Sequence, residues 1–383
     1  MSKPVLASRL TTLDESATLA LNARVKLMAA EGKQVYNLTA GELATDTPEY
    51  IQEAVAKTLD QNKYTPVAGL PELRQEIALN ARKFYGLDWI GPANVVVTGG
   101  AKPALYASLL SLVNPGDEVI LPTPAWVSYK HLIELVGGKV VEVPLADDFD
   151  LDPTAVLEAL TPQTKAIILN SPHNPTGAVF SHGAVARLAE RLKDTDVTVI
   201  SDDIYAKLVF ADDFVLVPKA GFENLVIVNG FSKSQALTGW RIGYLIADTP
   251  IAAAATSLLS HINGNAALPS QQAALAALAH GDQPPQETLD TLKTQRQMVC
   301  EALDTMLQLK YHAPGGAFYV FIDVREITDN SEQWCEDLLA ETGVAVVPGE
   351  AFLAPGYARL TFVTDESILR EALEKLKQFA EKS

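Results

Sequence analysis

Residues 230–243 read Gly-Phe-Ser-Lys-Ser-Gln-Ala-Leu-Thr-Gly-Trp-Arg-Ile-Gly. Lys233 lies among small residues directly after an apolar run, and Arg241 follows eight positions later. A lysine amine can form a Schiff base with an aldehyde, and a guanidinium can give a phosphate two parallel hydrogen bonds. An isolated lysine is usually a solvated surface charge, but this combination suits pyridoxal phosphate, because Ser232 beside the lysine leaves room for the ring.

The bulk composition narrows the classes to which the chain can belong. Its 383 residues are enough for two lobes with sizeable cores. Hydrophobic residues make up 48% and charged residues 20%, which is ordinary for a soluble globular protein. The formal net charge of −17 argues against nucleic acid as a partner and against binding to an anionic membrane surface.

Three further features bear on location. Residues 1–21 contain no unbroken apolar run, so we expect no signal peptide. Thr249–Gly281 lacks charged residues but is interrupted by polar residues and proline, which predicts core or subunit contact rather than a membrane span. Cys300 and Cys335 lie far apart and in no metal-binding spacing, which is typical of reduced thiols in a cytoplasmic protein without a metal site.

Short runs rich in β-branched residues recur between helical patterns such as Pro103–Val113, Thr154–Leu160 and Ala184–Lys193. They are mostly apolar on both faces, as in strands buried between two helix layers. The alternation predicts an α/β fold with a mostly parallel seven-stranded sheet between helices. The expected strands are Asn94–Thr98, Glu118–Leu121, Lys139–Val143, Lys165–Leu169, Val197–Ser201, Leu225–Asn229 and Ile242–Ile246.

The pattern changes after about residue 282 and predicts a smaller α+β domain. We expect an N-terminal arm at 1–44 that packs with this small domain, a large cofactor-binding domain at 45–285 and the small domain at 286–383. The elements expected in the small domain are a helix at Gln286–Leu309, strands at Ala317–Val324, Val344–Val347 and Arg359–Phe362, and a helix at Glu366–Lys382.

Residues suited to ligand binding follow five of the expected strands. Ligands of open α/β sheets collect at the carboxyl ends of the strands. We therefore expect these residues to form one site. They are Gly99–Lys102, Trp126, Asn174, Asp202 with Tyr205, and Lys233.

The turn Thr98–Pro103 reads Thr-Gly-Gly-Ala-Lys-Pro and joins a strand to a helix. The small residues Gly100 and Ala101 let backbone N–H groups, including that of Lys102, approach a phosphate at the helix N-terminus. A plain glycine turn with a helix cap is the alternative.

Asp202 can keep the pyridine nitrogen of the cofactor protonated, which makes the ring a better electron sink. It fits equally well as a helix cap. Tyr205 can donate a hydrogen bond to the phenolate oxygen of the cofactor. Trp126 can stack on a planar ring, although an ordinary core tryptophan is the simpler interpretation.

At every defined position the Lys233 segment resembles the lysine signature of class I aminotransferases. The resemblance runs from about Ser16 to the last helix. It implies fold type I, pyridoxal 5'-phosphate as cofactor, and Lys233 both as its attachment point and as the group that moves a proton.

The resemblance implies roles at three more positions. Asn174, in Ser-Pro-His-Asn-Pro-Thr-Gly at 171–177, would contact the phenolate oxygen of the cofactor. Arg359 would bind the substrate α-carboxylate, as would the backbone of Gly41. Cis peptide bonds are implied at Thr123–Pro124 and Asn174–Pro175.

Tyr64 lies in Lys-Tyr-Thr-Pro-Val-Ala-Gly-Leu-Pro-Glu-Leu at 63–73. In the family the tyrosine of this segment reaches the phosphate bound by the other subunit. The resemblance thus implies a homodimer with shared sites.

The chain resembles most closely the bacterial aspartate aminotransferase branch, with Ser-Ala-Thr at 16–18 and Lys102 after the glycine turn. In that branch this lysine and the nearby hydroxyls are the candidates for binding the distal carboxylate of the substrate. Relatives that accept prephenate carry a basic residue where this chain has Asp14. The segment Gly41–Thr45 departs from the family continuation Gly-Glu-Pro-Asp-Phe.

The predicted activity is transfer of the amino group of an L-amino acid, most plausibly aspartate, to 2-oxoglutarate by a ping-pong mechanism. The alternatives are an aminotransferase for aromatic amino acids, alanine or prephenate, or a carbon–sulfur lyase, which usually carries histidine where Tyr205 stands. A pyridoxal-phosphate-dependent gene regulator would need an added DNA-binding domain, for which the chain has no spare segment. A protein that keeps this fold without catalysis is disfavoured because Lys233, Asp202, Arg241 and Arg359 are all present.

Overall fold

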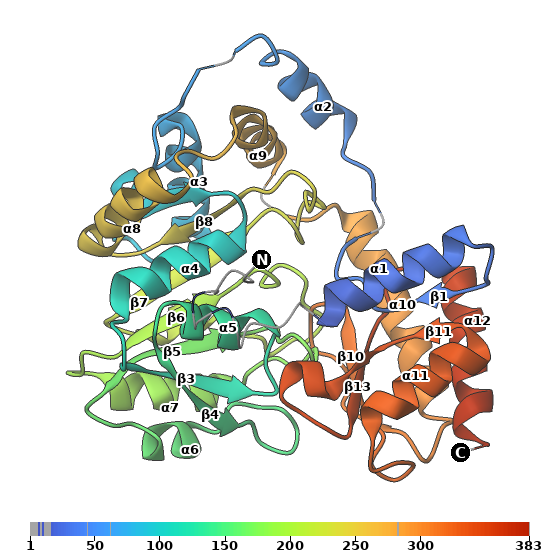
Figure 1. Cartoon of the computed structure of the whole chain (residues 1–383). Coiled ribbons are helices and arrows are strands. Elements are labelled where there is room, and N and C mark those ends of the chain that lie inside the picture. Colours follow the sequence, from blue (N-terminus) through green and yellow to red (C-terminus); the bar gives the residue numbers. More distant parts are fainter. Residues whose placement is uncertain are drawn as a thin grey trace, which may run out of the picture.

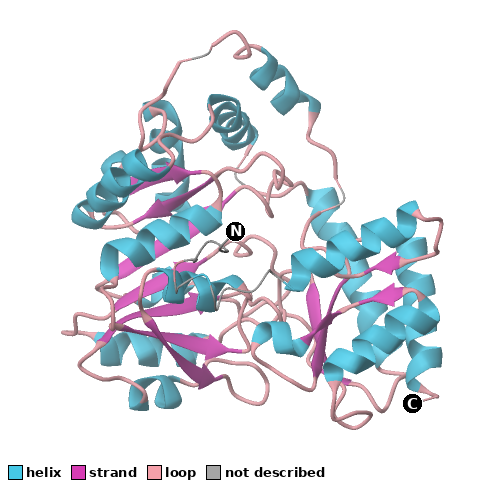
Figure 2. Ribbon diagram, viewed as in Figure 1, coloured by secondary structure: helices cyan, strands magenta, loops and turns pink. Residues whose placement is uncertain are grey.

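The computed structural model describes residues 7, 10, 17–43, 45–61, 63–281 and 283–382. Asp14, Ser16 and Ala44, which figure in the expectations above, lie outside the described residues. The chain forms a large sheet covered by helices and a smaller body built around a second sheet (Figures 1 and 2).

The seven predicted strands form one sheet, and each matches its expected bounds to within two residues. The strand order is β2-β8-β7-β6-β5-β3-β4, and β8 alone runs antiparallel to its neighbours. The predicted α/β fold with a mostly parallel sheet is confirmed. The strands are β2 (Val95–Thr98), β3 (Glu118–Thr123), β4 (Lys139–Pro144), β5 (Thr164–Asn170), β6 (Thr198–Asp202), β7 (Leu225–Gly230) and β8 (Gly243–Ile246).

Helices cover both faces of this sheet. Successive residues of each inner strand point to opposite sides, so the apolar side chains of one strand are buried under helices on both faces. Val97 packs in one hydrophobic core and Val96 in the other. The edge strand β4 differs from the expectation of two apolar faces, since its Lys139 and Glu142 are exposed. The helices are α2 (Glu49–Ala56), α3 (Pro71–Tyr85), α4 (Ala101–Leu112), α5 (Ser128–Leu135), α6 (Pro153–Glu158), α7 (His182–Leu192), α8 (Thr249–Ile262) and α9 (Leu268–His280), with short 3-10 turns η2 (Pro92–Asn94) and η3 (Val217–Ala220).

The smaller body contains an antiparallel sheet in the order β12-β13-β10-β9 and has its own core. The N-terminal helix α1 (Ala17–Ala30) lies against it in Figure 1, and β1 (Tyr36–Asn37) pairs in parallel with β11 (Val344–Ala345). The other elements are α10 (Gln286–Leu303), β9 (Lys310–Tyr311), β10 (Tyr319–Asp323), α11 (Ser331–Thr342), β12 (Val347–Pro348), η4 (Gly349–Phe352), β13 (Tyr357–Thr361) and α12 (Glu366–Ala380).

Two expectations for the small body were wrong. The single strand expected at Val344–Val347 is two strands, because β11 pairs with β1 whereas β12 pairs with β13. The helix expected to reach Leu309 ends at Leu303, where Asp304 begins a run of turns. The domain boundaries after residues 44 and 285 remain predictions.

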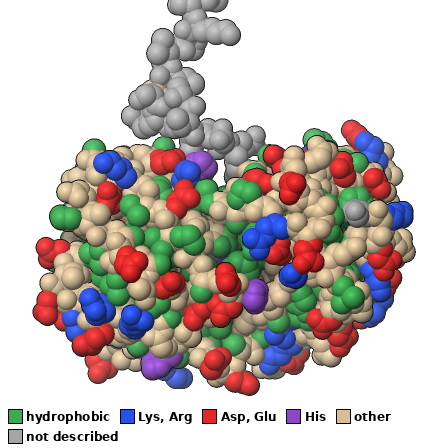
Figure 3. Space-filling view, turned by 90° about the horizontal axis from the view of Figure 1, so that it is seen from below, with side chains coloured by type: hydrophobic (Ala, Val, Ile, Leu, Met, Phe, Trp, Pro, Cys, Tyr) green, Lys and Arg blue, Asp and Glu red, His purple; other side chains and the backbone are tan. Residues whose placement is uncertain are grey.

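Both predicted cis peptide bonds, Thr123–Pro124 and Asn174–Pro175, are present, and Ser171–Pro172 is a third that was not predicted. On the face shown in Figure 3, acidic and basic side chains are interspersed. Within the described ranges, no helix is both long enough and apolar enough to cross a membrane.

Candidate active site

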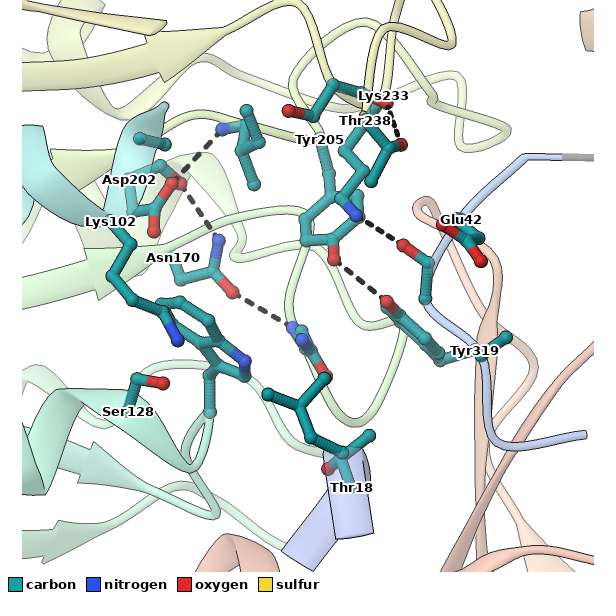
Figure 4. Close-up of a pocket in the computed structure, with 18 of the residues that line it drawn as sticks. Thr18, Glu42, Lys102, Ser128, Asn170, Asp202, Tyr205, Lys233, Thr238 and Tyr319 are labelled. Carbon is teal, nitrogen blue, oxygen red and sulfur yellow. Dashed lines mark hydrogen bonds between the residues drawn. The ribbon is translucent and has the colours of Figure 1, made fainter. Parts of the chain in front are cut away.

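A cavity of about 490 Å³ opens at the carboxyl ends of the parallel strands, between the large sheet, α1 and the small body. Figure 4 shows that its side chains come from segments far apart in the sequence. Most of the predicted site residues line it, and Gly100 and Tyr64 are outside its lining. Those that line it are Gly41, Ala101, Lys102, Trp126, Asn174, Asp202, Tyr205, Ser232, Lys233, Arg241 and Arg359.

Lys233 follows β7 and reaches across the cavity to the other body. Its Nζ donates a hydrogen bond to the backbone oxygen of Gly41 (Figure 4). Burial lowers the pKa of Lys233 to about 8, while the nearby carboxylate of Glu42 acts in the opposite direction. A lowered pKa leaves a larger fraction of neutral amine, which is the form that attacks a carbonyl carbon.

Asp202 is the last residue of β6 and is almost fully buried. Its Oδ2 accepts a hydrogen bond from the Tyr129 hydroxyl (2.8 Å) and its Oδ1 accepts one from the backbone N–H of Ile204 (3.2 Å). Burial raises the pKa of Asp202 to about 6, against the opposing effect of these hydrogen bonds. The helix-cap alternative was wrong in detail, because a turn rather than a helix follows Asp202. Its carboxylate therefore faces the cavity, where it can pair with a protonated ring nitrogen.

Arg359 is a buried cation without a carboxylate partner among the described residues. Its Nη1 donates to Asn174 Oδ1 (3.0 Å) and its Nη2 donates to Thr39 O (2.9 Å). Its Nε is buried without a hydrogen-bond acceptor in the part of the chain that the structure describes, and the guanidinium lies 4.4 Å from the ring centre of Tyr319. A buried, unpaired guanidinium is costly unless an anion binds to it, so this position suits the carboxylate of a ligand.

The end of the cavity at α4 suits a phosphate. Gly100 has φ +113°, and a Cβ on it would lie 2.6 Å from Arg241 Nη2. A Cβ on Gly243 would lie 2.6 Å from the backbone N of Ala101. The two glycines thus let Arg241 approach the free N–H groups at the N-terminus of α4, which is an anion-binding arrangement. This contact favours the predicted phosphate site over a plain glycine turn.

Trp126 and Lys102 form another side of the cavity. The Trp126 ring is only partly buried and packs edge-on against Tyr129, with ring centres 5.2 Å apart. Lys102 is exposed in this chain, and its Nζ lies 4.9 Å from the centre of the Trp126 ring. Partial desolvation of its amine within the cavity and the charge of Arg241 both lower the pKa of Lys102. Trp126 is therefore a wall of the cavity and not an ordinary core residue.

Residues 33–376 match the family of class I and II aminotransferases. The chain belongs to this family. Pyridoxal phosphate is the cofactor of its members, and the residues of the cavity fit it: a lysine amine, a buried carboxylate, and a phosphate-binding helix terminus with an arginine. The architecture is that of the fold type I transferases.

Curated relatives share the full length of this aminotransferase. The aspartate aminotransferase of Thermotoga maritima is 40% identical, with 98% of this chain and 99% of the relative aligned. The aspartate/prephenate aminotransferase of Thermus thermophilus is 38% identical, with 97% of each chain aligned. The chain is assigned to the bacterial aspartate aminotransferase branch of the class I aminotransferases.

Solved structures of the same proteins agree with this assignment. The crystal structure of the Thermotoga maritima aspartate aminotransferase superimposes with a TM-score of 0.92 and 39% identity, covering 98% of this chain and all of that one. The Thermus thermophilus enzyme with maleate gives the same TM-score and the same coverage at 37% identity.

The sequence missed several side chains that line the cavity of this aminotransferase. Asn170 donates from Nδ2 to Asp202 O (2.8 Å) and accepts at Oδ1 from the backbone N–H of Asn174 (2.9 Å). The hydroxyls of Tyr205 and Tyr319 lie 2.9 Å apart. Asn170 ends β5, so its place at a strand end could have indicated it. Nothing in the sequence around Tyr319 did so.

Tyr64 lies outside the lining of the cavity of its own chain. It is 97% exposed. Its contact with the phosphate of another subunit remains a prediction.

Proposed function

We propose that this aminotransferase moves the amino group of L-aspartate to 2-oxoglutarate. The observation that carries the proposal is the set of basic side chains that line the cavity, namely Lys102, Lys233, Arg241 and Arg359. The names of the relatives, among them an aspartate aminotransferase from Thermotoga maritima, support it. Maleate, present in the related Thermus thermophilus structure, is a dicarboxylate.

The cavity supplies a partner for each part of the cofactor. Lys233 Nζ would hold it, Arg241 and the N-terminus of α4 would bind its phosphate, and Asp202 would pair with its ring nitrogen. Trp126 would pack against the ring, and the Nδ2 of Asn174 and the Tyr205 hydroxyl would donate to its phenolate oxygen. Bound pyridoxal phosphate supplies an electron sink for the pair of electrons left when the substrate Cα loses its proton.

Lys233 then acts as the base and acid of the reaction. With its amine free, Lys233 Nζ would take the proton from the substrate Cα as a base and give it back as an acid. Its lowered pKa, about 8, keeps a useful fraction of the amine neutral near neutral pH. Release of one keto acid before a second one binds would give ping-pong kinetics.

Lys102 is assigned to the distal carboxylate by elimination. Four basic side chains line the cavity within the described ranges: Lys102, Lys233, Arg241 and Arg359. Lys233 binds the cofactor, Arg241 the phosphate and Arg359 the α-carboxylate. Lys102 is the remaining cation, and a lysine–carboxylate pair gains strength when the site excludes water.

The test is a panel of amino donors with Lys102→Ala. We expect kcat/KM for aspartate to fall by about tenfold or more, as for loss of a charged hydrogen bond, with much smaller losses for alanine and phenylalanine. Lys293→Ala, an exposed lysine on α10, is the control and should change none of the three. Equal losses for all three donors in Lys102→Ala would remove the main support for aspartate.

We also propose that the enzyme is a cytoplasmic homodimer. The exposed ring of Tyr64 and the exposed side chain of Arg241 support a contact between subunits at the phosphate. The two free cysteines, Cys300 and Cys335, are compatible with a reducing compartment.

A further inference from the structure

One wall of the cavity comes from helix α1 and includes Asn22, which the proposed mechanism does not use. Thr18 and Asn22 lie four positions apart on this helix, so they share one face, and both line the cavity. Figure 4 shows Thr18 on the α1 side of the cavity, whereas Lys102 and Ser128 come from α4 and α5 of the large sheet.

The orientation of the Asn22 amide follows from its neighbours. The backbone N–H of Thr39 can only donate, and it points at one end of the Asn37 side chain (3.1 Å), as does the Thr39 hydroxyl (2.7 Å). That end of Asn37 must therefore be its oxygen. Its nitrogen is then the atom that lies 2.7 Å from Asn22, and it must meet the oxygen of Asn22.

With its oxygen turned to Asn37, Asn22 presents its Nδ2 on the other side of the amide, and no acceptor for Nδ2 is found among the described residues. Thr18 Oγ1, on the same helix face, is buried without a hydrogen-bond partner in the described part of the chain. The wall formed by Thr18 and Asn22 therefore offers an N–H and a hydroxyl to the cavity. Lys102 and Ser128 add donors from the large sheet. A group that only accepts hydrogen bonds, namely a carboxylate, satisfies all of them.

We propose that Asn22 is a specificity-determining residue that donates a hydrogen bond from Nδ2 to the distal carboxylate of the substrate, and that Asn37 is the positioning residue that orients it. The inference rests on the proposed function, because it takes the distal group to be a carboxylate. Asn37 also reaches the α-carboxylate site, since Thr39, which it holds, accepts from Arg359 Nη2. One side chain thus connects both ends of the substrate position.

Asn37→Asp is the most specific test because the new side chain can keep the contact with Thr39 and changes the contact with Asn22. The carboxylate keeps an oxygen for Thr39 but turns a second oxygen toward Asn22, where a nitrogen stood. The Asn22 amide then turns over and presents its oxygen to the cavity. We expect kcat/KM for aspartate to fall by about 10- to 100-fold relative to asparagine, whose side-chain amide can donate to that oxygen, with alanine little changed.

Asn22→Ala separates this effect from the added charge. In that background Asn37→Asp should leave the ratio of aspartate to asparagine unchanged, because no amide remains to turn over. A ratio that still shifts would mean that the charge acts at a distance, and the assignment of Asn22 would fail. Equal losses for all three donors in Asn37→Asp would show a merely structural role and would also overturn it.

Binding of succinate and of propionate to the pyridoxal-phosphate-loaded enzyme gives a readout without turnover. Asn22→Ala and Asn37→Asp should weaken succinate binding by about tenfold or more and leave propionate unchanged, since only succinate has a distal carboxylate. If wild-type enzyme bound both acids equally and did not prefer aspartate, the proposed function would fail. If wild-type preferred succinate and aspartate but the variants kept both preferences, the present inference alone would fail.

Discussion

Asp202 and Asp203 are adjacent carboxyl groups that face different surroundings. Asp202 faces the cavity, whereas Asp203 accepts a hydrogen bond from the Ser201 hydroxyl (2.6 Å) and another from Tyr85. The Oδ2 of Asp203 is buried without a partner among the described residues. Burial raises the pKa of Asp203 to about 7, with Asp202 as a further cause. At the scale of single residues, two adjacent aspartates that look alike in the sequence thus have different surroundings and different hydrogen-bond partners.

The variant Asp203→Asn tests this difference through stability. Between about pH 4 and 7 the folded protein keeps a proton on Asp203 that the unfolded chain has lost, so this residue lowers stability as the pH rises. Asparagine does not titrate. Its stabilising effect should be absent near pH 4 and grow to at most about 4 kcal/mol at pH 8.5. Urea unfolding of wild type and variant at both pH values measures it, and a gain that is the same at both would contradict the protonation argument.

Lys233→Ala tests the cofactor attachment at the same scale. Purified wild-type enzyme should absorb visible light, and borohydride reduction should fix the cofactor to a peptide that contains Lys233. The variant should lose both the adduct and essentially all transamination. Mapping of the adduct to another lysine would refute the assignment of Lys233.

The phosphate end depends on how two elements approach each other. The start of α4 and the start of β8 meet backbone to backbone, and Gly243 has no space for a side chain there. Gly239, in the same loop, has no atom within 4 Å of the position that a Cβ would take. The two glycines look alike in the sequence, and the packing of the elements distinguishes them.

We therefore expect Gly243→Ala to weaken the binding of pyridoxal phosphate, because the backbone at the N-terminus of α4 has to move away. Overpacking of this kind typically costs about 1–3 kcal/mol, which corresponds to about tenfold or more in Kd. Titration of the cofactor-free protein measures this. Gly239→Ala is the matched control and should bind the cofactor like wild type, so a similar loss in both variants would argue against the backbone contact.

At the scale of the whole molecule, the active site exists only where distant parts meet. Lys233 bonds to Gly41, Asn174 to Arg359, and Tyr205 to Tyr319, across the boundary between the large sheet and the small body. A second subunit that supplies Tyr64 would extend the same principle. The large sheet and the small body must therefore both fold and also meet before the active site is complete.

Subunit exchange tests the proposed dimer. Lys233→Ala and Tyr64→Ala are each expected to impair every site of their own homodimers. A mixed dimer has one site that combines an intact Lys233 with an intact Tyr64 from the other subunit. Mixing the variants after mild dissociation should therefore restore activity, up to about a quarter of wild type for random exchange. Activity that is only the average of the two variants would contradict shared sites.

Much of the fold and most of the site could be read from the sequence, because their signals are local. The strand runs are apolar over both faces, the turn at Gly99–Lys102 needs small residues, and Lys233 lies in a characteristic segment. Parallel strands bring their carboxyl ends to one edge, so residues that follow them meet without any knowledge of packing. The two predicted cis bonds came from resemblance, and the third, at Ser171–Pro172, had no such signal.

Only the tertiary structure decided which side chains complete the site. Tyr129 meets Asp202 from 73 positions away, Tyr319 meets Tyr205 from 114 positions away, and Asn37 orients Asn22. It likewise divided the run at Val344–Val347 between two sheets. The physical reason is that a sequence pattern specifies local conformation and the buried face of an element, whereas the partner of a polar side chain depends on how elements pack across long separations in the chain.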